Sequence, residues 1–186
     1  MSILARLRET TAPAHEKLDA GVELERRLAR HEDRIGLVQA FHAFHSASEA
    51  LLRRWLPAGH DLDARSRIAS LEADLRALGA EPVAPSATTP ADTSRALGWL
   101  YVVEGSSLGG RVIRRDLESR GVDVVGLSFL DPYGAQVGAR WRETVAFLEG
   151  QSARPDVDGQ AVLAGALDAF AYALQSLSPH DRSPHD

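Results

Sequence analysis

The chain of 186 residues contains no cysteine. This absence excludes disulfide bonds, a thiolate nucleophile, cysteine-ligated zinc, iron–sulfur clusters and a cofactor attached through Cys-x-x-Cys-His. The sequence also lacks a Glu-x-x-His motif, which argues against the carboxylate di-iron sites of some helical bundles. A metal site in this chain would therefore depend on histidine.

Long apolar runs and blocks of one charge are absent as well. No run is long enough to span a bilayer, and no signal-peptide pattern opens the chain. The net charge of −5 is spread along the sequence, without a basic block or an RNA-binding signature. We therefore expect a soluble, cytoplasmic protein that binds neither nucleic acid nor membrane. Its length fits one domain with a substantial core.

Helical periodicity dominates what is present, and no segment makes a convincing sheet. The sequence predicts an all-α, single-domain bundle of about six helices over residues 1–177. Residues 178–186, which repeat Ser-Pro-His-Asp, are expected to form a disordered tail. Pro13 either kinks the first helix or lies in the first turn of a new one. The expected helices are centred on residues 4–18, 33–56, 68–78, 94–121, 137–148 and 162–177.

Four glycines interrupt the helical stretch 98–110. Each costs about 1 kcal/mol relative to alanine inside a helix. Gly98, Gly105 and Gly109 fall on one stripe of this helix. Either the stripe packs closely against another helix, or a flat ligand lies against its bare backbone. The neighbouring Gly110 and the hydroxyl pair 106–107 add to the second interpretation, and both remain open.

Histidines provide the candidate metal ligands. His15 lies beside the apolar stripe of the first helix, and Asp19 lies one turn further on, where it could accept a hydrogen bond from Nδ1–H. A carboxylate that holds an imidazole is typical of a metal-ligating histidine, although for a single His-x-x-x-Asp a half-buried histidine paired with an ordinary surface acid is the commoner arrangement. His42 and His45 are three residues apart and could share a metal. We expect His45 at the edge of the core and His42 on the surface.

These features together fit a flat iron cofactor, with an axial imidazole on one side and a close, non-ligating backbone on the other. Residues 7–19 resemble the N-terminal helix of the haem oxygenases, and residues 100–110 resemble their distal helix. The similarity is greatest to the small bacterial, biliverdin-producing members. The pairs Tyr133-Gly134 and Arg140-Trp141 also fit. The resemblance extends over nearly the whole chain to about Leu177.

The resemblance implies a helical domain that holds haem between its first helix and the distal helix. His15 takes the position of the proximal iron ligand, and Asp19 that of the family's acidic residue one turn later. Ser106 stands where many members have aspartate, so proton delivery would use water held by serine hydroxyls or backbone carbonyls. Gly105, Gly109 and Gly110 match the distal glycines. Arg8, Lys17 and Arg140 are candidate contacts for the haem propionates.

The implied activity is oxidative opening of haem at a meso carbon, which yields biliverdin, ferrous iron and CO. Gly105, Gly109 and Ser106 would steer bound oxygen toward one meso edge. Electrons would come from a ferredoxin or a reductase, because no flavin- or nicotinamide-binding glycine motif is present. A bacterial phytochrome could accept the biliverdin, or the reaction could release iron. The alternatives are a haem carrier or sensor that does not turn haem over, and a plain scaffold protein.

Overall fold

The computed structural model describes residues 1–89 and 91–178. In this part of the chain it contains seven α-helices, three short 3₁₀ turns and no strand, so the predicted all-α fold is confirmed. Residues 179–186, which make up most of the expected disordered tail, lie outside the described residues. The elements are α1 (Ile3–Val22), α2 (Leu24–Ala29), α3 (His31–Trp55), η1 (Asp63–Arg65), α4 (Ile68–Ala77), α5 (Thr93–Ser119), η2 (Ser128–Leu130), η3 (Gly134–Gln136), α6 (Val137–Ser152) and α7 (Gly159–Leu177).

The N-terminal region contains one helix more than the sequence predicts. Pro13 neither ends nor restarts α1, which runs unbroken from Ile3 to Val22. Glu23 follows the last residue of α1 in the left-handed conformation, with a φ of 49°, and the short α2 begins directly after it. The charged residues 20–32 lie between the first two helices that the sequence predicts. Burial of Leu28 against the core overrides that local composition.

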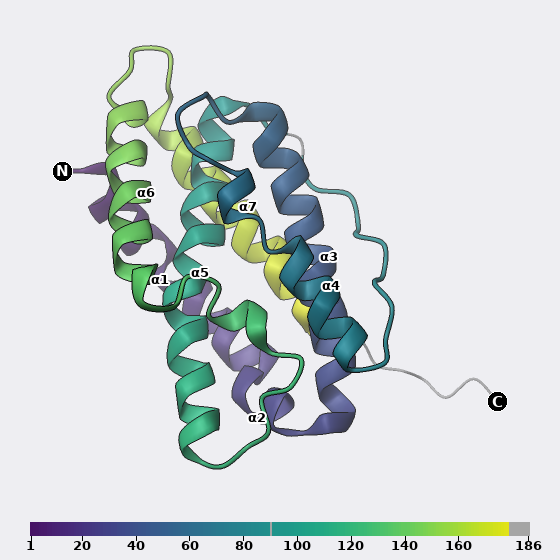
Figure 1. The fold of residues 1–186 in the computed structure, drawn as a ribbon. Coiled ribbons are helices and arrows are strands. Elements are labelled where there is room, and N and C mark those ends of the chain that lie inside the picture. Colours follow the sequence, from purple (N-terminus) through teal and green to yellow (C-terminus); the bar gives the residue numbers. More distant parts are fainter. Residues whose placement is uncertain (90, 179–186) are drawn as a thin grey trace.

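The long helix α5 runs through the middle of the fold (Figure 1). Helix α6 lies along one side of it, and α3 with α4 lies on the other. Helix α7 crosses α5 closely because both helices carry a glycine where they meet. A Cβ added to Gly98 would lie 2.1 Å from the carbonyl oxygen of Val162, and one added to Gly165 would lie 2.1 Å from that of Arg95. Close helix packing therefore explains Gly98.

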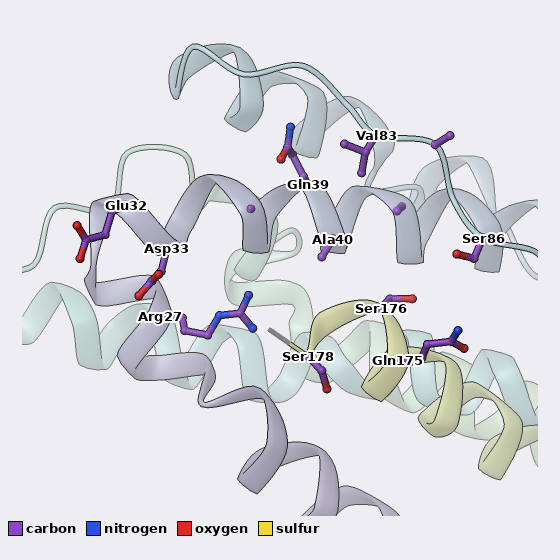
Figure 2. Close-up of a pocket in the computed structure, with 13 residues that line it drawn as sticks. Arg27, Glu32, Asp33, Gln39, Ala40, Val83, Ser86, Gln175, Ser176 and Ser178 are labelled. Carbon is purple, nitrogen blue, oxygen red and sulfur yellow. The ribbon is translucent and has the colours of Figure 1, made fainter. Parts of the chain in front are cut away.

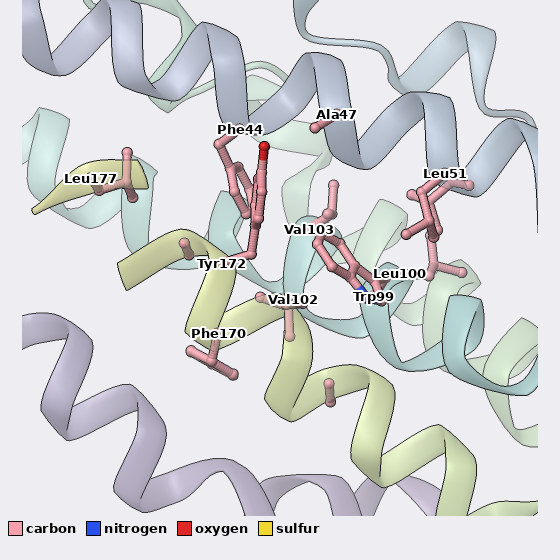
Figure 3. Close-up of a cluster of buried hydrophobic side chains, with 14 of the residues drawn as sticks. Phe44, Ala47, Leu51, Trp99, Leu100, Val102, Val103, Phe170, Tyr172 and Leu177 are labelled. Carbon is pink, nitrogen blue, oxygen red and sulfur yellow. The ribbon is translucent and has the colours of Figure 1, made fainter. Parts of the chain in front are cut away.

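Aromatic side chains fill the core beside this crossing (Figure 3). Trp99 is fully buried, and its ring centroid lies 5.6 Å from that of Tyr172. Tyr172 also faces Phe44 at 6.1 Å and donates a hydrogen bond to the carbonyl oxygen of Ser86 at 2.8 Å. These contacts join α3, α5, α7 and the connection before α5 into one core, and truncation of a buried aromatic of this kind costs about 3–5 kcal/mol.

Two buried charged side chains hold the connection between α5 and α6 in place. The Asp74 carboxylate accepts hydrogen bonds from the backbone N–H groups of Ser128 and Phe129, at 3.0 and 2.9 Å. Arg34 donates to the carbonyl oxygen of Val125 at 3.0 Å. The connection thereby places Phe129 and Leu130 against α5.

None of the helices in the described part of the chain is long and apolar enough to cross a bilayer.

Candidate functional site

A cavity of about 320 Å³ opens between α1, α3, α5, α6 and α7. This volume falls within the range of small-molecule sites, which is about 300–1,000 Å³. Most of its wall is apolar, and its polar groups are few. The residues with ionisable or hydroxyl groups that line it are Arg8, His15, Asp19, Arg67, Tyr101 and Ser106.

Helix α1 supplies the imidazole of this cavity. His15 and Asp19 are one helical turn apart, and the Asp19 carboxylate lies 2.9 Å from His15 Nδ1. A hydrogen bond from Nδ1–H leaves the lone pair of neutral imidazole on Nε2, which is the arrangement of a metal-ligating histidine. The imidazole is 63% exposed, and its ring centroid lies 5.8 Å from that of Phe170 in α7. The pair predicted from sequence is thus formed, and it lies at the cavity.

Helix α5 presents bare backbone to the same cavity. A Cβ added to Gly109 would meet no heavy atom within 4 Å, and one added to Gly105 would touch only the Trp141 ring, at 3.7 Å. Gly110 differs, because its Cβ would lie 2.6 Å from the carbonyl oxygen of Leu130. The two interpretations of the glycine stripe therefore apply to different residues. Gly98 and Gly110 allow close packing, and Gly110 also lines the cavity, whereas Gly105 and Gly109 leave space in the cavity wall.

Ser106 lies next to a buried arginine that sequence reasoning missed. The Ser106 hydroxyl donates to the carbonyl oxygen of Val103 at 2.7 Å and accepts a hydrogen bond from Arg67 Nη1 at 3.0 Å. Arg67 Nη2 also donates to the Val103 carbonyl, at 3.1 Å. Burial lowers the pKa of the Arg67 guanidinium. Ser107, by contrast, is buried away from the cavity and donates to the carbonyl oxygen of Glu104 at 2.6 Å.

No protein-family model matches the chain, but individual proteins do. It is 36% identical over 151 residues to the haem oxygenase of Xanthomonas campestris pv. campestris. That alignment covers 78% of this chain and 89% of the Xanthomonas protein. The chain belongs to the haem oxygenase family. It is also 31% identical to haem oxygenase PigA of Pseudomonas aeruginosa, over 89% of this chain and 86% of PigA.

A solved structure shows the haem oxygenase fold directly. The haem oxygenase of Neisseria meningitidis, determined with NO and CO bound, superposes with a TM-score of 0.77. The match covers 95% of this chain and 90% of that one, at 24% sequence identity. The fold expected from the resemblance is therefore confirmed. Membership of a family of enzymes rests on the Xanthomonas and Pseudomonas relatives.

The basic residues considered as propionate contacts do not all reach the cavity. Arg8 is exposed on α1 and lines it. Arg140 is not among its lining residues. Its guanidinium lies 6.0 Å from the centroid of the Tyr133 ring and 3.5 Å from the Glu143 carboxylate. Lys17 does not line the cavity either. In a protein of the haem oxygenase family, Arg8 is thus the better placed of these candidates.

The histidine pair of α3 is more deeply buried than expected. His42 was predicted on the surface but is only 8% exposed, and His45 is 1% exposed. Within the described part of the chain, none of their four ring nitrogens has a hydrogen-bond partner. Desolvation holds the pKa of His45 well below its usual value, with help from the charge of Arg67. The described residues contain no cluster of three His, Asp or Glu side chains that could hold a metal ion.

A second cavity of about 510 Å³ lies between α3, the end of α7 and the connection before α5 (Figure 2). Charged and polar side chains line it, among them Arg27, Glu32, Asp33 and Gln39. Its described wall contains no histidine and no aromatic ring. This cavity therefore offers neither an iron ligand nor a surface for stacking a flat ring.

Proposed function

We propose that this chain opens haem at a meso carbon and releases biliverdin, ferrous iron and CO, with O₂ and externally supplied electrons as co-reactants. The observation that carries the proposal is that one cavity combines the His15–Asp19 pair of α1 with the open backbone of Gly109 in α5. An imidazole can ligate haem iron from one face, and a bare backbone lets the flat ring lie close on the other. Membership of the haem oxygenase family supports this assignment.

The residues of the cavity suit haem in charge as well as shape. The iron supplies the O₂ chemistry, and the protein supplies ligation, orientation and control of water. Asp19 accepts a hydrogen bond from the His15 imidazole and orients it, with Nε2 free to ligate iron. The exposed guanidinium of Arg8 can pair with a propionate, while apolar side chains such as Phe129 and Phe170 enclose the ring. These groups would fix the macrocycle in one orientation.

Ser106 and Arg67 form a connected polar part of the cavity wall on the α5 side. Since the Ser106 hydroxyl is both donor and acceptor, it can hold a water molecule as its hydrogen bonds rearrange. Arg67 adds a buried positive charge beside it, which favours negative charge that develops nearby. In this proposal a water molecule held at Ser106 carries protons, because residue 106 is a serine and supplies no carboxylate for this role.

The electron donor in this proposal is a separate ferredoxin or reductase, because the chain carries no nucleotide-binding glycine loop. We place the reaction in the cytoplasm, where such reduced donors occur. A bacterial phytochrome that takes up biliverdin as chromophore is the proposed acceptor, with iron release as the other use of the reaction.

A haem titration followed by turnover tests the proposal. We expect a Soret band that saturates at one haem per chain, and then its decay into the broad red absorption of biliverdin when ascorbate or reduced ferredoxin is added in air. His15→Ala should lose the imidazole-ligated spectrum and nearly all turnover, and free imidazole should restore the spectrum. A Soret band that persists with reductant would indicate the haem carrier or sensor instead, and absence of any Soret band would refute haem binding.

A further inference from the structure

A buried polar cluster lies directly behind the cavity wall at Gly105. It consists of Arg65 from η1, Glu104 from α5, Tyr133 from the α5–α6 connection, and Glu143 and Thr144 from α6. Arg65 Nη1 lies 2.7 Å from Glu104 Oε2, and both side chains are only 4% exposed. The Tyr133 hydroxyl donates to Glu104 Oε1 at 3.1 Å. Arg65 Nη1 also lies 3.2 Å from Thr144 Oγ1.

The cluster connects the two protein segments that meet at the cavity wall. Glu104 immediately precedes Gly105 in α5. Arg65 Nη1 reaches the carbonyl oxygen of Arg140 at 3.4 Å, and Arg140 immediately precedes Trp141 in α6. Trp141 in turn lies within 3.7 Å of the Cβ position of Gly105 and lines the cavity. One guanidinium thus ties the bare backbone of α5 to the aromatic ring that faces it.

Stability alone gives a weak reason for this arrangement. A buried ion pair must overcome the desolvation of both charges, and replacement by apolar side chains is often neutral or stabilising. What such a pair does provide is a fixed orientation, because its hydrogen bonds hold the two partners in one relative geometry. Such orientation is useful at this point of α5, because Gly105 has no side chain of its own and a Cβ there would face only the Trp141 ring, at 3.7 Å.

Tyr133 strengthens the same contact. Burial and the adjacent Glu104 carboxylate raise the pKa of Tyr133 to about 12, so its hydroxyl keeps its proton and remains a donor. Glu104 Oε1 is therefore held from the connection, and Oε2 is held from η1. Movement of α5 at Gly105 would break both contacts.

We propose that Glu104, held by Arg65 and Tyr133, is a positioning residue that sets the α5 backbone at Gly105 and the Trp141 ring relative to each other, and thereby determines which edge of the haem is opened. This inference rests on the proposed function for its last step. The in-plane orientation of a flat ligand depends on the side chains along its edge, and Trp141 is the large ring that the cluster fixes there. Glu104 itself does not line the cavity.

Two conservative variants test the positioning. Glu104→Gln keeps the shape of the side chain but loses its charge, and Tyr133→Phe removes one hydrogen bond with little change in packing. The first measurement uses haem-free protein labelled with ¹⁵N, in which Trp141 gives one of three tryptophan indole signals. We expect the Trp141 signal to move in both variants. The matched control is Glu118→Gln, which removes a 45%-exposed carboxylate of the same helix as Glu104 outside the cluster and should leave that signal in place.

The second measurement is the distribution of biliverdin isomers, together with the in-plane haem orientation read from haem-methyl proton shifts of the ferric complex. We expect the share of the minor isomer to rise about fivefold in Glu104→Gln and Tyr133→Phe, the change that loss of one such hydrogen bond produces. Haem affinity should stay within about twofold of that of the unaltered chain. Glu118→Gln should leave the isomer distribution unchanged.

The two measurements separate the two proposals. An unmoved Trp141 signal in both variants would overturn the positioning role, and so would an unchanged isomer distribution and haem orientation. Failure of the unaltered chain to bind or degrade haem would overturn the proposed function, while the haem-free spectra would still decide the positioning of Trp141. If Glu104→Gln does not fold, Tyr133→Phe alone decides the result.

Discussion

Gly98 of α5 and Val162 of α7 approach so closely that a Cβ at residue 98 would lie 2.1 Å from the Val162 carbonyl oxygen. Eleven residues along the same helix, a Cβ at Gly109 would meet nothing within 4 Å. Glycines on one helical stripe thus serve two purposes. At one end the missing side chain lets two helices meet, and at the other it leaves room in a cavity wall.

The first prediction separates these purposes by stability. Gly98→Ala forces backbone against backbone, so we expect it to lower the free energy of unfolding by about 3 kcal/mol or prevent folding. Gly109→Ala has space for its methyl group and removes a helix-interior glycine, so it should raise that free energy by about 0.5–1 kcal/mol. Urea denaturation measures both. Equal losses in the two variants would contradict the division.

The second prediction concerns the cavity itself. Gly109→Leu places a branched side chain in the open space on α5, where a flat ring would have to lie. We expect haem affinity to fall at least about tenfold, since displacement of the ring costs more than about 1.4 kcal/mol. Gly150→Leu is the control, because a Cβ at Gly150 also meets nothing within 4 Å but that glycine does not line the cavity. Unchanged haem affinity in Gly109→Leu would show that α5 does not form part of the haem site.

The His15–Asp19 pair was predictable because both residues lie on one helix, where spacing alone fixes which side chains meet. Arg67 was not predictable in this way. Its partners Val103 and Ser106 are 36 and 39 residues away, and it precedes α4 in a segment without helical periodicity. Nothing in the sequence distinguishes it from the surface arginines. The two uses of glycine were likewise open, because spacing shows which glycines share a face but not what approaches it.

Two expectations drawn from the local sequence were wrong. Charges at residues 20–32 concealed α2, which forms because Leu28 is buried. His42 was expected on the surface because it lies off the apolar stripe of its helix, yet α4 covers it and places Glu72 4.0 Å from its Nε2. Both errors share a cause. Tertiary packing decided the burial, and the sequence window contained none of the residues that pack there.

The third prediction tests Ser106. Its hydroxyl holds Arg67 and the Val103 carbonyl at the cavity wall, and no charged group is lost on truncation. We expect Ser106→Ala to slow haem opening about fivefold, which corresponds to about 1 kcal/mol, and to change haem affinity by less than about twofold. Single-turnover spectroscopy and haem titration measure the two effects. Equal loss of rate and affinity would mean that Ser106 acts mainly on structure.

The fourth prediction is a pH dependence of stability. Burial holds the pKa of folded His45 well below its usual value of 6.5, so between these two pKa values only the unfolded chain takes up the proton. Stability is therefore present above about pH 6.5 and is lost as the pH falls, at up to about 1.4 kcal/mol per pH unit. We expect His45→Leu to reduce the slope of unfolding free energy between pH 6.5 and 5.5 by about that amount. The exposed His31, changed to Gln, should leave the slope unaltered.

The last prediction distinguishes the basic residues of α1. Arg8 lines the cavity, whereas Lys17 is exposed on the same helix but does not line it. If Arg8 pairs with a propionate, Arg8→Gln should raise the dissociation constant for haem about three- to tenfold, a range set by the partial exposure of the pair. Lys17→Gln should leave it within about twofold, which makes it a matched control for loss of one positive charge. The effect of Arg8→Gln should shrink at high salt, because screening weakens an exposed ion pair. Equal effects of the two substitutions would show that α1 acts through its overall charge. If neither substitution changes the dissociation constant, the propionates do not contact the basic residues of α1.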